Sequence, residues 1–399
     1  MDARIFIPKN AKEQRRENAA FILRVIRDSD GISRAKLAKK TGLSMPSVSK
    51  IISYLEDLGL LELQMRSGNN QKQIPFYTFK GGRYGALGLE IGRRDVVGIG
   101  CDLSGRIFGE FCFDYHDGNL EHLIDRSVER IRHLLTDAER EGLKILGLGI
   151  GSPGPIDPDE RVILTPPYFY GWRDIPIGSL FESRLGIPVL LEKAPNLSAL
   201  AEGIMGAGRG MKNLIFMDAG EGIGTGIIYK GKIFHGNSEV YCSLGHTTVD
   251  IRGPVCDCGN RGCLEVYTKE SVVTEKVSNA KSPEDKETIL KEAAEYLSAG
   301  VANLINLFGI KTVVIGGDTV DAHEKLFEYM VEDIPGRAFP SLHRKIKILR
   351  STLHNRSEAL GGALWIGELA LLNLNSPHFN SEPPRGHLLY EGTQLTYGQ

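Results

Sequence analysis

Residues 246–265 read HTTVDIRGPVCDCGNRGCLE, and this glycine-broken stretch holds one histidine and three cysteines. Zinc favours four nitrogen and sulfur ligands in a tetrahedron, and a set of three cysteines and one histidine leaves no open position for water or substrate. The stretch therefore predicts a loop over residues 246–263 that closes around a structural Zn²⁺ ion, with four ligands: His246, Cys256, Cys258 and Cys263.

The same cysteines allow a second interpretation, as small apolar residues or as a disulfide plus a spare thiol. A Cys-x-Cys pair followed by Gly259 is loop chemistry without the periodicity of a core, which favours the metal site. The remaining cysteines, Cys101, Cys112 and Cys242, are scattered. Because there is no leader that resembles a secretory signal and no apolar run long enough to span a bilayer, we expect reduced cysteines, a cytoplasmic location and no membrane partner.

Charge is divided unevenly along the chain. The 399 residues are 41% hydrophobic and 25% charged, which predicts a globular protein of two or three domains. Residues 1–80 hold 15 Lys and Arg against 8 Asp and Glu, a net charge of +7, and the remainder holds 33 against 42, a net charge of -9. A basic head on an acidic body suggests that the head meets a polyanion.

The sequence pattern of the head predicts three helices. Apolar residues recur at helical spacing over 17–27, and the polar segment 28–31 stops that helix. Ser33 can cap a second helix that extends to Lys40, and a tight turn at 41–43 leads to Ser44, which can cap a third. We expect the third helix to bury four apolar side chains: Val48, Ile51, Ile52 and Leu55.

A hairpin completes a winged helix domain over residues 1–80. Residues 61–64 and 74–79 alternate as strands around a basic turn at 66–73. In such a domain the third helix enters the major groove of double-stranded DNA, while the hairpin touches the backbone or the minor groove. The expected DNA contacts are Ser44, Met45, Ser47, Ser49 and Lys50 from the helix, and Arg66 and Lys72 from the hairpin. The alternative is a three-helix module that binds protein.

After a short linker at 81–84, the body alternates strands and helices. We expect a β-hairpin from 86–91 and 96–102, strands at 145–150 and 213–217, and helices at 120–135 and 195–205. This order predicts an α/β body with two lobes. Glycine-rich turns lie at 219–226 and at 316–317, where a backbone without side chains can approach phosphate or ribose.

Several motifs together resemble the ROK family of repressors, open reading frames and sugar kinases. They are the winged head, GIGSPGP at 149–155, the alternate glycines of 220–226, the cysteine loop and IGG at 315–317. The resemblance implies an actin-like ATPase (ribonuclease H-like) fold of two lobes over residues 81–373, with sugar in the cleft between them, followed by a C-terminal tail at 374–399. Family repressors, such as those for xylose or N-acetylglucosamine catabolism, carry a DNA-binding head that family kinases lack.

Compared with the kinases of that family, this chain is changed at three places. The kinases carry an Asn-Asp pair whose Asp is the general base, and the matching residues here are Lys193 and Ala194. The first phosphate loop, usually Asp-x-Gly-Gly-Thr, reads EIGRR at 90–94, and Glu221 replaces a Thr in the second, where we expect its carboxylate to repel phosphate. Because removal of a positioned base costs about 10²–10⁴ in rate, the resemblance implies no kinase activity.

The resemblance also implies a changed sugar pocket, with six ligand contacts: Gly92, Tyr168, Lys193, Ser243, His246 and Glu265. His246 would ligate zinc through one ring nitrogen and sugar through the other, although it and Glu265 could instead only brace the loop. The aromatic residues of 168–172 either stack on a sugar or belong to the core. Lys193 suggests an acidic or phosphorylated ligand, and the alternative is a neutral oligosaccharide in an enlarged pocket.

These inferences converge on a DNA-binding transcriptional regulator of carbohydrate metabolism, with repression as the family default. A sugar or sugar derivative in the cleft would change the spacing of two heads, and zinc would rigidify the ligand loop. One chain reads only one half-site of a palindromic operator, so we expect a homodimer or homotetramer. The rivals are a sugar kinase with a replacement base, such as Asp157 or Asp174, and a scaffold whose body binds no ligand.

Overall fold

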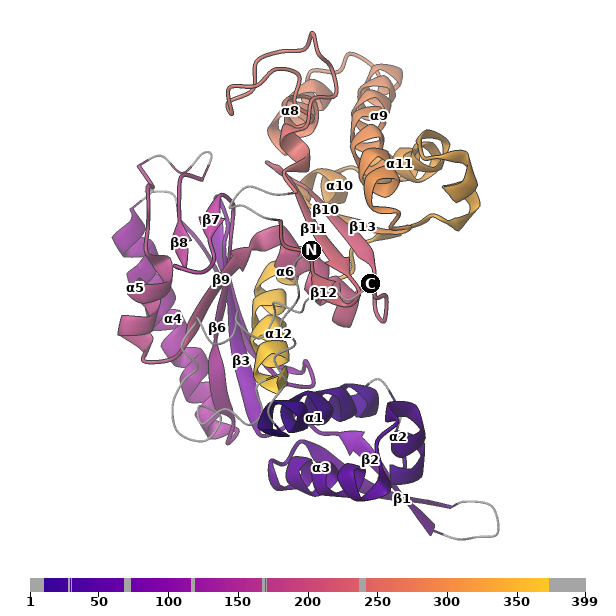
Figure 1. Ribbon diagram of the computed structural model, residues 1–399. Coiled ribbons are helices and arrows are strands. Elements are labelled where there is room, and N and C mark those ends of the chain that lie inside the picture. The colour runs from indigo at the N-terminus through magenta and orange to yellow at the C-terminus, as the bar shows by residue number, and fades with distance from the viewer. Residues whose placement is uncertain are drawn as a thin grey trace, which may run out of the picture.

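Figure 1 shows the computed structural model of the chain, in which a small helical head lies at one end of a larger body. The structure describes residues 11–27, 29, 31–67, 73–115, 119–166, 169, 171–236 and 242–372. The tail at 374–399 lies outside these residues. Among the helices of the described residues, none is long and apolar enough to cross a membrane.

The head consists of three helices and a hairpin: α1 Ala11–Arg27, α2 Arg34–Thr41, α3 Met45–Asp57, β1 Leu61–Ser67 and β2 Gln73–Phe79. The predicted caps are confirmed, because the side chain of Ser33 accepts a hydrogen bond from the first turn of α2 and that of Ser44 from the first turn of α3. α1 begins at Ala11, earlier than the sequence pattern indicated. β1 continues to Ser67, so that Arg66 lies in a strand and not in the turn.

A continuous hydrophobic core joins the head to the body. β2 ends at Phe79 and the first strand of the body begins at Tyr84, so the predicted boundary at residue 80 falls in a short connection. Gly81 packs so closely on the next turn that a Cβ at this position would lie 2.2 Å from the backbone nitrogen of Ser104. The same buried cluster contains Leu23 from the head and Leu364 from the body. The predicted linker is therefore packed against the body.

The first lobe of the body is a five-stranded sheet in the order β5-β4-β3-β6-β9. Its strands are β3 Tyr84–Ile91, β4 Asp95–Asp102, β5 Ile107–Asp114, β6 Lys144–Ser152 and β9 Val189–Lys193. α4 Leu120–Arg140 and α5 Ile177–Leu185 complete this lobe together with a short hairpin of β7 Ile156–Asp157 and β8 Val162–Ile163. Asn119 caps α4, whose apolar stripe packs on the sheet.

The second lobe repeats the plan of the first. Its sheet has the order β12-β11-β10-β13-β14, and in both sheets the first three strands are antiparallel and the last two join in parallel. The strands are β10 Leu214–Ala219, β11 Ile223–Tyr229, β12 Lys232–Ile233, β13 Thr312–Gly316 and β14 Lys347–Arg350. Helices α7 Glu265–Thr268, α8 Glu270–Ser278, α9 Pro283–Phe308, α10 Asp318–Ala322 and α11 Glu324–Arg337 belong to this lobe.

Two helices, α6 Ala194–Ile204 and α12 Ser357–Leu372, pack against each other between the two sheets (Figure 1). α6 contacts β10 and β11 of the second lobe, and α12 contacts β3, β4 and β6 of the first. The approach is close enough to require glycine, since a Cβ on Gly361 would lie 2.1 Å from the carbonyl oxygen of Leu197. At its other end α12 reaches α1 of the head.

Candidate functional site

A cleft of about 640 Å³ opens where the two lobes face each other. The ends of β3 and β10, the first turns of α6 and α12, and the cysteine loop contribute to its lining. Five of the six predicted ligand residues line this single cleft, namely Gly92, Lys193, Ser243, His246 and Glu265. Tyr168 lies outside the described residues. The sequence thus predicted a set of positions that the fold does bring together.

Lys193 and Ala194 stand at the junction of β9 and α6, with Ala194 as the first residue of the helix. Both side chains are almost fully buried, and both residues line the cleft. Burial lowers the pKa of Lys193. A methyl group at position 194 can take no proton, so this wall of the cleft offers a buried cation beside a group without acid-base chemistry.

A buried carboxylate that the sequence reading missed holds this junction in place. Glu192 accepts hydrogen bonds from the backbone nitrogen of Lys193 at 2.8 Å and from the side chain of Asn196 at 2.9 Å. Its second oxygen lies 2.6 Å from Nε2 of His235. Burial lowers the pKa of His235, but the charge of Glu192 and its hydrogen bond raise that pKa by more. The pair therefore fixes the start of α6 and puts a second basic group near Lys193.

Glu265, the first residue of α7, is buried and braces the turn between β10 and β11. Its Oε2 accepts a hydrogen bond from the backbone nitrogen of Ile223 at 3.0 Å. A Cβ on Gly245 would lie 3.0 Å from the same oxygen, so the 3-10 turn η2 Leu244–His246 also packs against it. This contact supports the bracing role that the sequence left open for Glu265.

The cysteine loop brings its four predicted metal ligands together. Their ligand atoms all lie within 4.8 Å of one another, with 3.7 Å between the sulfurs of Cys258 and Cys263 and 3.7 Å between Cys256 Sγ and His246 Nδ1. A disulfide bond is about 2.0 Å long, whereas metal–sulfur bonds of about 2.3 Å give tetrahedron edges of roughly 3.8 Å. The donor set and its spacing therefore fit a four-coordinate metal ion.

A cluster of carboxyl groups also lines the cleft, and the sequence indicated only one of them, Glu90 of the first phosphate loop. Glu90 lies near the end of β3, Asp218 lies near the end of β10, and Glu358 lies in the first turn of α12. Burial and then the charge of Glu358 raise the pKa of Glu90 well above its usual value, and burial does the same for Asp218. Burial, and then the charges of Asp95 and Asp318 against a hydrogen bond from Glu90, raise the pKa of Glu358 to about 7.

Glu221 has a hydrogen-bond partner that the sequence did not indicate. Its carboxylate accepts hydrogen bonds from the backbone nitrogen of Ser271 at 3.0 Å and from the Ser271 hydroxyl at 2.9 Å. The carboxylate therefore binds the first turn of α8, while Glu221 remains part of the cleft lining. The expected repulsion of a phosphate by this carboxylate stays a prediction.

The structure bears on two alternatives that the sequence left open for the cleft. Asp157 and Asp174, named as replacement bases for a kinase, are both described and neither belongs to the lining of the cleft. Phe169 and Trp172 are buried in the core of the first lobe, with ring centroids 4.8 Å apart, and neither lines the cleft. Hydrophobic packing decided their place, as it does for most aromatic clusters. Tyr168 and Tyr170 lie outside the described residues.

The predicted DNA contacts on α3 lie on the surface of the head. Ser44, Met45, Ser47 and Lys50 are exposed and Ser49 is half-buried, whereas the apolar face of the helix packs inward, with Val48, Ile52 and Leu55 buried and Ile51 only half-buried. Arg66 is half-buried, and its guanidinium lies over the ring of Phe76, 5.3 Å from the centroid. Lys72 lies outside the described residues. Helix α3 therefore presents the face that the sequence indicated.

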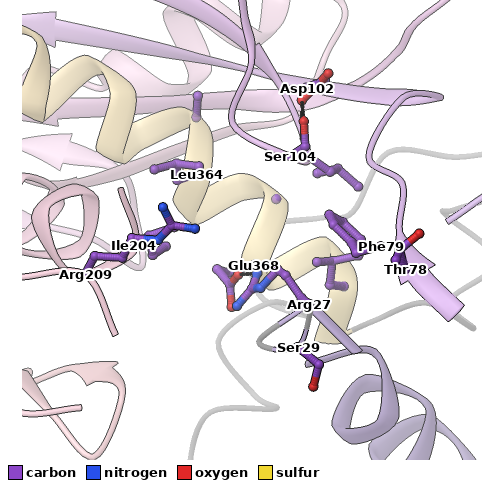
Figure 2. A pocket seen from close by; sticks show the side chains of 14 residues that line it. Arg27, Ser29, Thr78, Phe79, Asp102, Ser104, Ile204, Arg209, Leu364 and Glu368 are labelled. Atoms are coloured by element: carbon purple, nitrogen blue, oxygen red, sulfur yellow. Dashed lines mark hydrogen bonds and ion pairs between the residues drawn. The ribbon is translucent and has the colours of Figure 1, made fainter. Parts of the chain in front are cut away.

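A smaller pocket of about 270 Å³ lies where the head meets the body (Figure 2). Arg27 of α1 projects from the head toward Glu368 of α12, with which it forms an ion pair. Arg24 also approaches Glu368, at 3.7 Å. Glu368 is largely shielded from solvent, with 18% of its side chain exposed. Sequence reasoning missed this contact between the head and the body.

Comparison with known protein families identifies the family of this chain. Residues 86–368 match the ROK family. The chain belongs to the ROK family. Residues 17–72 match the MarR family, which agrees with the winged helix of the head. The ROK region covers both lobes, so the repeated sheets are the two halves of an actin-like ATPase fold, as the resemblance implied.

Proteins similar to this chain match most of its length. The xylose repressor of Bacillus subtilis (strain 168) is 28% identical over 360 residues, covering 86% of this chain and 93% of the repressor. The DNA-binding transcriptional repressor Mlc of Escherichia coli (strain K12) is 24% identical over 383 residues, covering 90% and 94%. Each match covers more of the chain than the ROK region alone.

Solved structures give the same picture of the fold. A ROK family transcriptional regulator, a homolog of the Escherichia coli MLC protein, superimposes with a TM-score of 0.77 at 22% identity and covers 90% of this chain and 97% of its own. The ROK hexokinase from Thermus thermophilus has a TM-score of 0.60 at 26% identity and covers 70% of this chain and 97% of its own. The regulator thus matches a larger share of the chain than the hexokinase does.

Proposed function

We propose that this ROK protein is a DNA-binding transcriptional repressor of carbohydrate metabolism, whose effector is a sugar or sugar derivative bound in the cleft between the lobes. The observation that carries the proposal is the combination of an exposed α3 on a winged head with a cleft in which Ala194 occupies the start of α6. The similarity to repressors along nearly the whole chain supports it. A DNA target implies a cytoplasmic protein.

The head would bind double-stranded operator DNA through α3, with Ser47, Ser49 and Lys50 directed to the major groove. The net charge of +7 over residues 1–80 supplies attraction to phosphate that does not depend on sequence. Because each chain contains one such helix, a homodimer or a homotetramer would place two of them on two half-sites.

The cysteine loop would hold a Zn²⁺ ion through His246 Nδ1 and the sulfurs of Cys256, Cys258 and Cys263. A closed site of this composition supplies folding stability and no Lewis-acid chemistry. The loop leads directly into Glu265, which braces the turn at Ile223. The metal would therefore keep the second lobe's part of the effector site in a fixed shape.

Sugar phosphorylation is the rival activity, and the cleft argues against it. A kinase requires a carboxylate within hydrogen-bond reach of the attacking hydroxyl. The position at the start of α6, where the family's kinases carry the base, is Ala194, and Asp157 and Asp174 are not part of the cleft lining. The carboxyl groups that do line the cleft, Glu90, Asp218 and Glu358, stand on β3, β10 and α12 and not at the start of α6. A coupled assay with ATP and a panel of sugars is expected to show no turnover above the uncatalysed rate.

The chemistry of the cleft wall favours an acidic or phosphorylated effector over a neutral oligosaccharide. Lys193 is buried beside Ala194, and the pair of Glu192 and His235 lies directly behind it. An ammonium group in the partly desolvated wall of a cleft attracts an anion more strongly than one in bulk water. Equal affinity for a neutral sugar and for its phosphate would contradict this assignment.

Helix α12 would carry the effector signal to the head. Its first turn contributes Ser357 and Glu358 to the cleft, and Glu368 further along binds Arg27 of α1. A helix of 16 residues spans about 24 Å. Effector binding that moves the lobes would therefore move the end of α12 on which α1 of the head packs. A coupling free energy of about 1–3 kcal/mol between effector and DNA gives roughly fivefold to 150-fold control of DNA affinity.

The decisive experiment measures binding of the metal-loaded protein to duplex DNA from its own promoter region, with and without a panel of sugars and sugar phosphates. Fluorescence anisotropy at fixed salt gives the affinity, since such affinities have meaning only at a stated ionic strength. We expect specific binding that one compound of the panel shifts. Binding to promoter DNA no tighter than to random duplex would contradict the proposal.

A further inference from the structure

The two lobes are tied together across the cleft by arginines that no other feature of the proposed function requires. Nη1 of Arg93, in the turn between β3 and β4 of the first lobe, donates a hydrogen bond of 2.6 Å to the carbonyl oxygen of Glu221 in the second. The next residue, Arg94, lies 3.7 Å from Glu270 at the start of α8. Both contacts cross the opening of the cleft.

The two arginines differ in what surrounds them. Arg93 is half-buried in the cleft lining, whereas 68% of the Arg94 side chain is exposed. A hydrogen bond from a charged group in a partly desolvated site contributes more than an exposed ion pair, which contributes little. Arg93 is therefore the stronger tie, and Arg94 provides a natural control.

The acceptor of Arg93 belongs to a turn that is itself firmly held. The Glu221 carboxylate binds the backbone and side chain of Ser271, and Oε2 of Glu265 accepts from the backbone nitrogen of Ile223. The backbone nitrogen of Gly220 donates to the carbonyl oxygen of Gly222 at 3.1 Å. The turn at 220–223 thus has three of its groups held within the second lobe, and Arg93 joins it to the first.

The guanidinium of Arg93 packs against Gly222, which has no side chain. A Cβ on Gly222 would lie 2.8 Å from Nη2 of Arg93 and 3.3 Å from Oε2 of Glu265. Glycine at this position leaves room for the guanidinium beside the carboxylate that braces the turn. Arg93, Gly222 and Glu265 therefore form one packed contact between the lobes.

We propose that Arg93 is a positioning residue that latches the two lobes, so that the effector cleft is held partly closed by the protein's own side chain. The latch fixes the turn at 220–223 and, through it, Glu265. Its consequence for the effector rests on the proposed function, because it assumes that the cleft binds one. The latch itself depends on neither effector nor DNA, so it can be tested separately.

Hydrogen exchange of the full-length, metal-loaded protein tests the latch without any ligand. In Arg93→Ala, backbone amides at 220–223 should exchange about tenfold faster or more than in the wild type, because a charged hydrogen bond is lost. Small-angle scattering should show a larger radius of gyration as the lobes separate. Arg94→Ala, the matched control, should leave both measurements unchanged.

A second variant changes the residue of the second lobe against which Arg93 packs. Gly222→Ala adds only a methyl group, and the closest atom that it meets is the end of a flexible arginine side chain. The substitution should therefore displace the guanidinium without unfolding the protein, and the 220–223 amides should respond as in Arg93→Ala. Unchanged exchange at 220–223 in both variants, with normal thermal melting curves, would overturn the proposal even if the protein binds operator DNA and an effector.

Discussion

Glu368 of α12 forms an ion pair with Arg27 of α1, and this contact fastens the winged head to the body. The two residues are 341 positions apart in the sequence. The hydrophobic cluster that runs from Leu23 of the head to Leu364 of the body lies beside it. The head is therefore not a module on a loose tether, and its orientation depends on the same helix that begins at the cleft with Glu358.

Glu368→Gln is expected to uncouple the effector from DNA. The substitution keeps the shape of the side chain but removes the charge that holds Arg24 and Arg27. Operator affinity without effector should stay within about threefold of the wild type, while the effector-induced change, about fivefold to 150-fold where coupling is 1–3 kcal/mol, should fall to about twofold or less. Anisotropy titrations with the compound found in the panel measure both.

A matched control for this variant is Glu129→Gln, on the exposed side of α4. It changes the net charge by the same amount at a site away from the junction of head and body, so it should leave the effector response intact. If Glu368→Gln responds to effector like the wild type, α12 does not transmit the signal through this ion pair.

Local features of the fold could be predicted because their signals are local. Ser33 and Ser44 precede helices that they cap, and the cysteines of the loop at 246–263 are close enough in sequence that only a turn is needed to gather them. The alternation of strands and helices likewise indicated an α/β body. In each case the physical cause lies within a few residues of the pattern.

The contacts that position the site could not be predicted in the same way. Glu221 contacts Ser271 only after the second lobe has folded, across 50 positions of sequence. Arg93 contacts Glu221 only after the two lobes have met, across 128 positions. A comparison with the family's motif therefore identifies the charge of Glu221 but not its bonds to Ser271 in the first turn of α8. The acidic cluster of Glu90, Asp218 and Glu358 arises in the same manner from three separate elements.

Cys258→Ser should remove the metal from the loop. The variant keeps only three of the four ligands and can no longer form a closed tetrahedral site. After dialysis against a weak chelator, its metal content should therefore drop from about one ion per chain to well below that value. We also expect a weaker effector response and looser oligomer packing, because the loop supports Glu265. Cys112→Ser, an exposed cysteine on β5, is the control. An unchanged metal content in Cys258→Ser would disprove the ligand assignment.

Glu358→Gln should change how stability depends on pH. Burial and its acidic neighbours raise the pKa of Glu358 from 4.5 to about 7 in the folded protein, so folding favours the protonated form. The cost of ionising this carboxyl is absent below the unfolded pKa, grows as the pH rises and becomes constant above the folded pKa. Wild-type stability should therefore decline relative to the variant between about pH 5 and pH 7.

Urea unfolding midpoints of the two proteins at several pH values from 5.5 to 8 would measure this difference, with the metal site kept loaded. Glu129→Gln, exposed on α4, should run parallel to the wild type throughout. Parallel curves for Glu358→Gln would mean that this carboxyl titrates as it does in the unfolded chain, and the burial argument would fail.

Two substitutions in the head should affect DNA binding in different ways. Ser47 is exposed in the first turn of α3, so Ser47→Ala should alter which bases are preferred at one position of the half-site, with a discrimination of about 1–3 kcal/mol lost there. Lys72→Ala removes a cation from the hairpin and should weaken binding to all sequences alike. Its plot of log affinity against log salt should lose about one unit of slope.

Selection of binding sites from a random duplex pool, followed by titrations of the selected duplexes over a range of salt, separates the two effects. Lys80→Ala is a useful comparison, because Lys80 follows the hairpin and lies 3.8 Å from Glu62, which already balances its charge. It should change the salt slope less than Lys72→Ala does. If Ser47→Ala keeps the wild-type base preference and α3 variants differ only in overall affinity, the third helix does not read the major groove.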